Sequence, residues 1–244
     1  AHGKCVFYEI DDLLFDTEYP HSIETYGGQV DVIQYNGLQQ GMATMRAAAT
    51  LCDYGIASTR PLQELLAPLV RQRKCFLHRN GLDRQNIASS EVRQGEIKNY
   101  VNLFYGSGTK SHNSDFLQEV LSAVARLLTE NPNLKLTVVG YLELPDEFLR
   151  RYRSQILLLG HVKDVQAYWS YLSVSDINIA VLTPDRITDC KSELKWVEAA
   201  TYAVPSVVSA TANYIDIIKP RVDGLIAHSP ADWYEQLNYL VHDA

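Results

Sequence analysis

Strand-like and helical segments alternate from about residue 98 to the end of the chain, and this alternation constrains the fold more than any other feature. The strand-like segments are short and continuously apolar, as at residues 134–139 and 176–181. Between them lie segments with apolar residues at three-to-four spacing, such as residues 116–128. Continuously apolar strands separated by helices are typical of a parallel sheet that is covered on both faces. We therefore predict an α/β fold with a doubly wound, Rossmann-like parallel sheet, whose ligand binds beyond the carboxyl ends of the strands.

The strands and helices of this regular part can be placed from their apolar patterns. The expected strands are residues 101–105, 134–139, 156–159, 176–181, 205–209 and 225–227. The expected helices are residues 116–128, a short one after Pro145, and residues 164–172, 192–202, 213–218 and 231–241. Right-handed crossovers join consecutive parallel strands through such helices, so the order along the chain suits one sheet.

The first part of the chain, residues 1–97, is less regular. We expect strands at residues 5–10, 54–57 and 75–77, a helix at 35–51, and a polar linker at 84–98. Two or three strands are few for a separate α/β domain, so we predict a partial domain over residues 1–97 and a complete one over residues 98–244. Since the chain does not begin with Met and an apolar run follows almost at once, we expect it to be a piece of a longer protein.

Composition excludes several classes of protein. The 244 residues are 46% hydrophobic and 21% charged, as in an ordinary globular protein with a sizeable core. A formal net charge of −7 argues against a dedicated nucleic-acid binder, which needs a basic face for phosphates. The four cysteines (Cys5, Cys52, Cys75, Cys190) form no CxxC motif, so we expect free thiols and a cytoplasmic protein. No apolar run reaches transmembrane length, and no signal peptide is evident.

A first candidate ligand-binding cluster follows the expected strand at residues 101–105. It consists of Gly106, Ser107, Gly108, Thr109 and Lys110. Glycines allow the backbone to approach a ligand closely, and exposed N–H groups of such a turn can hold phosphate. The cluster is neither GxGxxG nor a Walker loop, which disfavours an NAD-dependent oxidoreductase. A tight turn from strand to helix, without any ligand, explains the glycines equally well.

A second cluster lies at the start of the expected helix 192–202. Ser192 suits the N-cap, and the helix N-terminus favours an anion at the ligand edge of the sheet. Lys191 and Lys195 share one helix face, and Glu198 lies one turn deeper. Cations for phosphate and a carboxylate for ribose hydroxyls would together suit a nucleotide. A solvated helix face with ion pairs is the alternative explanation.

The segment from residue 190 to residue 209 resembles the donor-site segment of GT-B glycosyltransferases of the GT4 type. In that family two glutamates flank a helix start, followed by a helix of small residues and a strand. Glu198 matches the second glutamate, which typically binds the ribose of the nucleotide. Cys190 stands at the place of the first, which contacts the transferred sugar in the family, and the neighbouring Asp189 could substitute for it. Ala203 replaces the usual glycine before the strand.

Other segments extend the resemblance over nearly the whole chain. Residues 104–112 resemble the phosphate loop, residues 160–162 the segment whose backbone contacts the base, and residues 223–226 a late turn. Upstream, residues 8–15 and 52–81 resemble the second half of the acceptor domain in a bacterial subgroup. The resemblance therefore implies the C-terminal domain of a GT-B protein, preceded by an incomplete acceptor-side domain.

The resemblance also assigns roles to residues. It implies that the catalytic residues are Lys191, Lys195 and Glu198. Donor binding is expected from Gly106, Ser107, Gly108, Thr109, Lys110, His161, Ser192, Glu193 and Leu194. His112, after the phosphate loop, could assist departure of the diphosphate, although a lone histidine is more often a surface residue. Adjacent Asp11 and Asp12 differ in spacing from a metal-binding DxD, and a strand-end cap or interdomain contact is the simpler interpretation.

The function implied is transfer of a sugar from a nucleoside diphosphate sugar to a glycan or lipid-linked acceptor. The family implies retention of anomeric configuration without a metal or other cofactor. The subgroup suggests surface polysaccharide biosynthesis, with no nucleic-acid partner and with peripheral membrane association left open. Two alternatives remain open: a sugar-nucleotide epimerase of the same fold, and a non-catalytic nucleotide-sugar-binding module of a larger protein.

Overall fold

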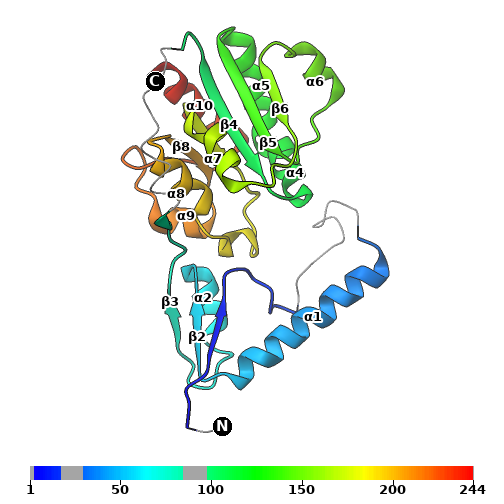
Figure 1. Cartoon of the computed structure of the whole chain (residues 1–244), viewed down its shortest axis with the longest axis vertical. Helices are drawn as coiled ribbons and strands as arrows, with labels where there is room; N and C mark the ends of the chain where they lie inside the picture. The colour runs from blue at the N-terminus through cyan, green and yellow to red at the C-terminus, as the bar shows by residue number, and fades with distance from the viewer. Residues whose placement is uncertain (1–2, 18–29, 85–97, 244) are drawn as a thin grey trace. The chain divides into compact units, whose positions relative to one another are not determined.

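The computed structural model describes residues 3–17, 30–84 and 98–243 of the chain (Figure 1). Every strand pairing within its two sheets is parallel, which confirms the predicted α/β fold class. The chain forms two compact units. Unit 1 comprises Ala1–Asn80, Pro184–Glu193 and Thr211–Asp216, and unit 2 comprises Gly81–Thr183, Leu194–Ala210 and Ile217–Ala244. The domain boundary expected at residues 97 and 98 stays a prediction, because most of the expected linker lies outside the described residues.

The larger sheet lies in unit 2 and has the strand order β6-β5-β4-β7-β8-β9. Its strands are β4 (Val101–Ser107), β5 (Leu134–Gly140), β6 (Ile156–Leu159), β7 (Ile177–Ala180), β8 (Ser206–Ser209) and β9 (Leu225–Ala227). The chain builds outward from β4 through β5 to β6, then returns to the other side of β4 as β7. The strand order thus reverses between β4 and β7. In doubly wound sheets, ligands bind at the carboxyl ends of the strands that flank this switch point.

Helices cover both faces of this sheet (Figure 1). One face carries α5 (Leu121–Glu130) and α10 (Pro230–Asp243), and the other carries α7 (Val165–Ser173) and α8 (Leu194–Thr201). A short helix α4 (Asn113–Asp115) and a π-helical turn (Phe116–Val120) lead into α5. The other short helices after β4 are α6 (Asp146–Arg151) and the 3-10 turn Lys110–His112 in unit 2, and the 3-10 turn Thr188–Cys190 and most of α9 (Ala212–Ile217) in unit 1.

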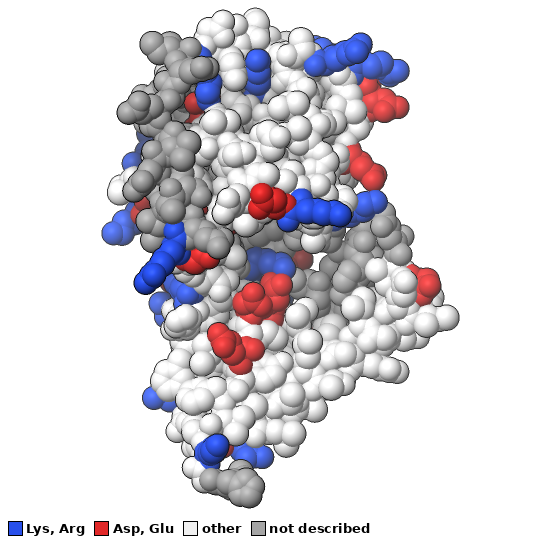
Figure 2. Space-filling view, in the orientation of Figure 1, with Lys and Arg blue, Asp and Glu red and all other residues white. Residues whose placement is uncertain are grey.

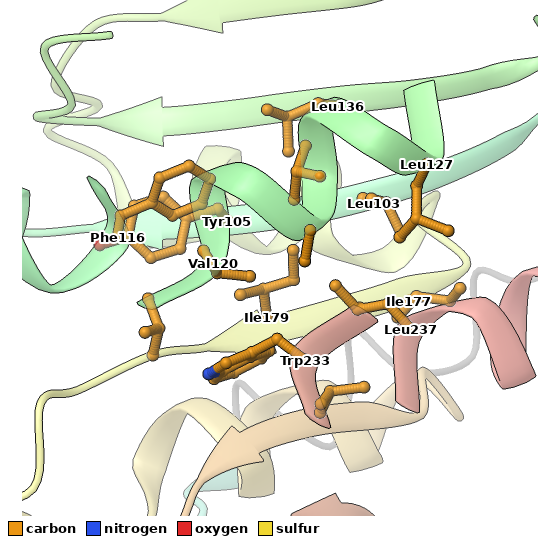
Figure 3. Packing of buried hydrophobic residues seen from close by; sticks show 14 of the residues in the cluster. Leu103, Tyr105, Phe116, Val120, Leu127, Leu136, Ile177, Ile179, Trp233 and Leu237 are labelled. Atoms are coloured by element: carbon orange, nitrogen blue, oxygen red, sulfur yellow. The ribbon is translucent and has the colours of Figure 1, made fainter. Parts of the chain in front are cut away.

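Alternate residues of β4 pack into different cores. Leu103 and Tyr105 belong to the cluster under α5 and α10, whereas Phe104 belongs to the cluster under α7 and α8. Figure 3 shows the first cluster, in which the ring of Phe116 lies against Tyr105 and Trp233 of α10 lies beside β7. Burial of these apolar side chains stabilises the fold by about 25 cal/mol for each Å² removed from water.

The sheet face beneath α8 also contains buried polar side chains. Asn178, in the middle of β7, is 2% exposed. Its Nδ2 donates to Ser206 Oγ at 3.0 Å and to the carbonyl oxygen of Lys195 at 3.2 Å. Because an unsatisfied buried amide costs about 1–3 kcal/mol, these bonds fix the first turn of α8 over the sheet.

The smaller sheet lies in unit 1 and has the order β1-β2-β3. Its strands are β1 (Phe7–Ile10), β2 (Tyr54–Ala57) and β3 (Cys75–Leu77), joined by helices α1 (Val32–Leu51) and α2 (Arg60–Leu66). Asp31 and Gln34 form a capping box at the start of α1, and Thr59 caps α2. The sequence pattern does not predict α2, since its 7 residues give too little apolar periodicity. The core of this unit contains Cys190, from the segment 184–193.

Candidate functional site

The last two residues of β4 and the turn after them, here together called the loop 106–110, lie at the switch point of the larger sheet and are held by the end of β5. Ser107 Oγ donates to the carbonyl oxygen of Thr109 at 2.9 Å, and the N–H of Tyr141 donates to the carbonyl oxygen of Ser107 at 3.0 Å. Gly140 has φ +109°, and a Cβ on it would collide with that same carbonyl oxygen. The loop therefore depends on a glycine in the neighbouring strand.

The two glycines of this loop have different surroundings. The ring and hydroxyl of Tyr168 occupy the space where a Cβ on Gly106 would lie, so a protein side chain makes the close approach expected of a ligand. A Cβ on Gly108 would meet nothing. Thr109 and Lys110 are exposed, with Lys110 Nζ 4.0 Å from Glu143 Oε1. The exposed part of the loop, residues 108–110, is thus the part that a ligand can reach.

The first turn of α8 approaches the end of β4. Lys195 Nζ lies 5.4 Å from the centroid of the Tyr105 ring, and Tyr105 directly precedes Gly106. A cation over an aromatic face gains about 0.5–1 kcal/mol, more when it is desolvated. Leu194, the first residue of α8, is 37% exposed. The structure therefore brings Lys195, within unit 2, to the strand residue that leads into the loop 106–110.

Glu198 is partly buried one turn further along α8. Trp169 Nε1 donates a hydrogen bond to Glu198 Oε1 at 3.1 Å, and Trp169 itself is 5% exposed. Burial raises the pKa of the Glu198 carboxyl above its ordinary value, while the indole N–H and the ammonium of Lys195 lower it. Indole and lysine thus favour a carboxylate that its burial alone would disfavour.

The predicted residues just before α8 are Lys191, Ser192 and Glu193, which belong to unit 1, and the side chains of Lys191 and Glu193 have partners there. Lys191 Nζ lies 2.9 Å from Asp12 Oδ1. Glu193 is 3% exposed, with Arg79 Nη1 3.3 Å from its Oε1 and Asn213 Nδ2 donating to its Oε2 at 2.9 Å. The side chain of Glu193 thus stabilises this unit. Helix α8 begins at Leu194, so Glu193, rather than Ser192, immediately precedes it.

The position of the first family glutamate is apolar. The thiol of Cys190 is 1% exposed, and burial, with smaller effects of nearby charges led by Asp189, raises its pKa to about 12. Its carbonyl oxygen accepts a hydrogen bond from Thr59 Oγ1 at 3.0 Å. Asp189 Oδ1 accepts from the N–H of Ala212 at 2.7 Å, at the start of α9. Cys190 cannot supply a carboxylate, and one oxygen of Asp189 already has a structural partner.

Two histidines flank the loop after β4. His161 is exposed after β6, and its ring stacks on Tyr141 at 5.4 Å with an interplanar angle of 17°. His112 Nδ1 lies 2.8 Å from Asp115 Oδ2. Asp115 is 8% exposed, so the sequence interpretation of His112 as a lone surface residue misses its buried carboxylate partner.

Several side chains that organise the site could not be assigned from the sequence. From the sequence pattern, Trp169 is interpreted as a residue of the helix packing and Tyr105 as one residue of an apolar strand. Asn178 carries a usable signal, because a polar residue within a buried apolar run needs a hydrogen-bond partner. Its partner, the carbonyl of Lys195, becomes evident only when the strand order is known.

Other candidate sites can be described for part of the chain. Among residues 3–17, 30–84 and 98–243, no group of three or more His, Cys, Asp or Glu is arranged to hold a metal ion. None of the helices in those ranges is long and apolar enough to cross a membrane. On the face shown in Figure 2, the basic side chains drawn in blue are scattered among acidic and uncharged ones.

Comparison with known proteins identifies the family. Residues 100–243, more than half of the chain, match the family described as Glycosyl transferases group 1. The chain belongs to this family. A search of curated protein sequences finds no significant match.

Solved structures share the fold of this group 1 chain. A TarM variant from S. aureus, in complex with fondaparinux, alpha-GlcNAc-glycerol and UDP, is similar with TM-score 0.63 at 12% identity over 97% of this chain. HepE of Anabaena in complex with UDP-glucose gives 0.61 at 15%, and WaaG, a glycosyltransferase involved in lipopolysaccharide biosynthesis, gives 0.59 at 16%, each over 97% of this chain. The chain spans 43% of TarM, 62% of HepE and 65% of WaaG.

Proposed function

We propose that this chain is the donor-binding part of a glycosyltransferase, which transfers a sugar from a nucleoside diphosphate sugar to an acceptor. The observation that carries the proposal is the approach of Lys195 Nζ, in α8, to Tyr105, the residue that precedes the glycine loop. Group 1 membership supports it, as does the presence of UDP or UDP-glucose in two of the similar structures. UDP is therefore the first nucleotide to test.

The proposed contacts follow the chemistry of each group. The backbone N–H groups of residues 108–110 and the ammonium groups of Lys110 and Lys195 would hold the diphosphate. Glu198, oriented by Trp169, would accept hydrogen bonds from the ribose hydroxyls. As the bond between sugar and phosphate breaks, charge grows on the leaving phosphate, and the fixed cations stabilise it. Lys191, Ser192, Glu193 and His161 stay predictions for donor binding.

The acceptor side is proposed from the resemblance and the similar structures. A glycan or a lipid-linked glycan is the expected acceptor, in surface polysaccharide or related glycan biosynthesis. Two of the similar structures support this proposal. The TarM variant was solved in complex with alpha-GlcNAc-glycerol, and WaaG is involved in lipopolysaccharide biosynthesis. Retention of configuration, independence from metals and a cytoplasmic location are part of the same proposal.

Calorimetric titration with UDP, GDP and dTDP tests the proposed site. We expect Lys195→Ala to weaken binding of the best nucleotide by roughly tenfold to a hundredfold, the value of a hydrogen bond between charged groups. Lys135→Ala is the matched control, because Lys135 Nζ also lies over a ring, 3.8 Å from the Tyr100 centroid, but at the amino end of β5. Equal nucleotide affinities of the unaltered chain, Lys195→Ala and Lys135→Ala would contradict the proposed site.

A second function is favoured by one observation. The place of the sugar-contacting glutamate is occupied by the buried thiol of Cys190, which suits a non-catalytic nucleotide-sugar-binding module. The full-length protein distinguishes the two functions when it is incubated with UDP-glucose and candidate acceptors. Release of UDP that depends on Glu198 supports the transferase, whereas binding without release supports the module.

A further inference from the structure

His112 and Asp115 form a pair directly after the proposed diphosphate loop. His112 ends the 3-10 turn Lys110–His112, and Asp115 ends α4. The distance from His112 Nδ1 to Asp115 Oδ2 is 2.8 Å, which is a strong hydrogen bond. The side chains are 23% and 12% exposed, so the imidazole retains a surface that a ligand can reach while the carboxylate is largely covered.

The pair shares its surroundings with Lys195. Phe116, which directly follows Asp115, has its ring centroid 4.6 Å from that of Tyr105, near the end of β4. Lys195 Nζ lies 5.4 Å from the centroid of the same Tyr105 ring. Tyr105 is thus a common neighbour of Lys195 and of the segment that carries the pair, and the pair directly follows the loop 106–110 at which the donor is proposed to bind.

The pair restricts the protonation states in which His112 can bind phosphate. An ionised carboxylate has only acceptor oxygens, so Asp115 requires a proton on His112 Nδ1. In the neutral imidazole, Nε2 is then an acceptor, and it cannot bond to the acceptor oxygens of a phosphate. Only the imidazolium can donate from Nε2 while Nδ1–H remains bonded to Asp115.

We propose that His112 binds the donor diphosphate as an imidazolium held by Asp115, so that donor binding is coupled to uptake of one proton from solvent. This inference rests on the proposed function and adds a residue to its site. His112 would be a donor-binding residue that stabilises the leaving phosphate, and Asp115 its positioning residue. The charged and titratable groups around the pair are Lys110, Glu119 and Tyr105, together with Glu143 beside Lys110 and Lys195 over Tyr105.

Proton uptake can be measured directly. We would titrate the chain with UDP at several pH values between 7.5 and 9, in pairs of buffers that differ in ionisation enthalpy. In this range the phosphates of UDP are ionised, so UDP itself takes up no proton. We expect uptake of about one proton, and an affinity that falls about tenfold for each pH unit.

Two variants separate the roles of the pair. In His112→Asn, proton uptake and the extra pH dependence should disappear, and affinity at pH 7.5 should fall severalfold. In Asp115→Asn, the amide accepts either tautomer of the imidazole, so a neutral Nε2–H can donate and proton uptake should decrease. If Asp115 were merely structural, Asp115→Asn would weaken binding equally at every pH and leave the uptake unchanged.

His242→Asn is the matched control for the loss of a histidine. His242 Nδ1 is also committed, at 2.9 Å from the carbonyl oxygen of Asn238 in α10. Its replacement should leave both proton uptake and affinity unchanged. Uptake that persists in His112→Asn, or no uptake by the unaltered chain, would overturn the inference while UDP binding that is sensitive to Lys195 upholds the proposed function. Failure of UDP, GDP and dTDP to bind at any pH overturns both.

Discussion

Glu198 combines two properties that oppose each other at the scale of a single residue. Burial raises the pKa of its carboxyl, so ionisation of this group is costly in the folded chain. The indole of Trp169 compensates in part by donating to Oε1. A carboxylate kept in such surroundings is typical of a functional site, since a buried amide or an apolar side chain would be easier to accommodate.

The first prediction concerns the charge of Glu198. Glu198→Gln keeps an oxygen for the indole and removes the desolvated charge, so we expect greater stability at neutral pH and roughly tenfold weaker UDP binding. The sign follows from the raised pKa, because the folded chain holds this proton more tightly than the unfolded chain. The ionised carboxylate lowers the free energy of unfolding by its full amount above the folded-state pKa. This loss disappears below the pKa of the unfolded chain, about 4.3 for a glutamate.

Urea unfolding and calorimetry measure the two effects of Glu198→Gln. The gain in unfolding free energy should decrease as the pH is lowered from 7 toward 4. A variant that is less stable than the unaltered chain at pH 7 would show that the carboxylate has a structural partner of greater value than its desolvation.

The second prediction concerns the indole of Trp169. Trp169→Phe retains an aromatic ring but removes the donor to Glu198. We expect UDP binding to weaken severalfold, and binding of 2′-deoxy-UDP to change less, since it lacks one of the hydroxyls that Glu198 would accept. Trp196→Phe is the control, because Trp196 Nε1 donates to the carbonyl oxygen of Asp223 at 2.8 Å instead. Equal losses for both nucleotides would assign Trp169 to packing alone.

At the scale of elements, the strand positions follow from apolar runs. The expected strands 156–159 and 225–227 coincide with β6 and β9, and 54–57 and 75–77 coincide with β2 and β3. A run of apolar residues bounded by Gly or polar residues is sufficient to locate such a strand, even in β6, whose Leu157 and Leu158 are exposed. β4 extends two residues beyond the expected end at residue 105, because Gly106 and Ser107 pair with β5. This pairing is not predicted, because the segment 106–108 has the composition of a turn.

The elements around the site were harder to infer than the sheet. The glycine loop and the start of α8 could be recognised from residue types, and their proximity follows from the rule for switch points. The contacts between α7 and α8 could not be inferred, since helical periodicity identifies an apolar face without naming its neighbour. Trp169 therefore reads as core, although its N–H reaches Glu198.

The third prediction concerns the turn after β5. In Gly140→Ala the new Cβ would strike the carbonyl oxygen of Ser107, at a φ of +109° that side chains rarely adopt. We expect a loss of more than about 1 kcal/mol in unfolding free energy, and weaker UDP binding because the loop 106–110 must shift. Gly41→Ala in α1 is the control, since a Cβ there meets nothing and alanine favours a helix. Unchanged UDP affinity in Gly140→Ala would show that the loop is not part of the site.

At the scale of the whole molecule, the two compact units do not follow the order of the chain. Unit 1 includes the segments 184–193 and 211–216, which follow β7 and β8 of the larger sheet. Arg79 bonds Glu193 and Asp216 within this unit, at 3.3 Å and 2.7 Å. Neighbours that distant in sequence are not visible in a pattern of apolar spacing. The sequence thus indicates a chain of two parts, but it does not indicate that the segments 184–193 and 211–216 belong to the first of them.

The last prediction follows from the packing of Cys190 among apolar residues of unit 1. While the segment 184–193 stays in place, the thiol is covered and its pKa of about 12 leaves almost no thiolate at pH 8. When the segment detaches, the pKa returns toward its ordinary value, and the thiolate fraction rises on the order of 10³-fold. Exposed Cys5 should react with maleimide at once, and Cys190 far more slowly. The alkylation half-life of Cys190, followed by mass spectrometry, would then report how frequently the segment 184–193 opens locally in the native protein.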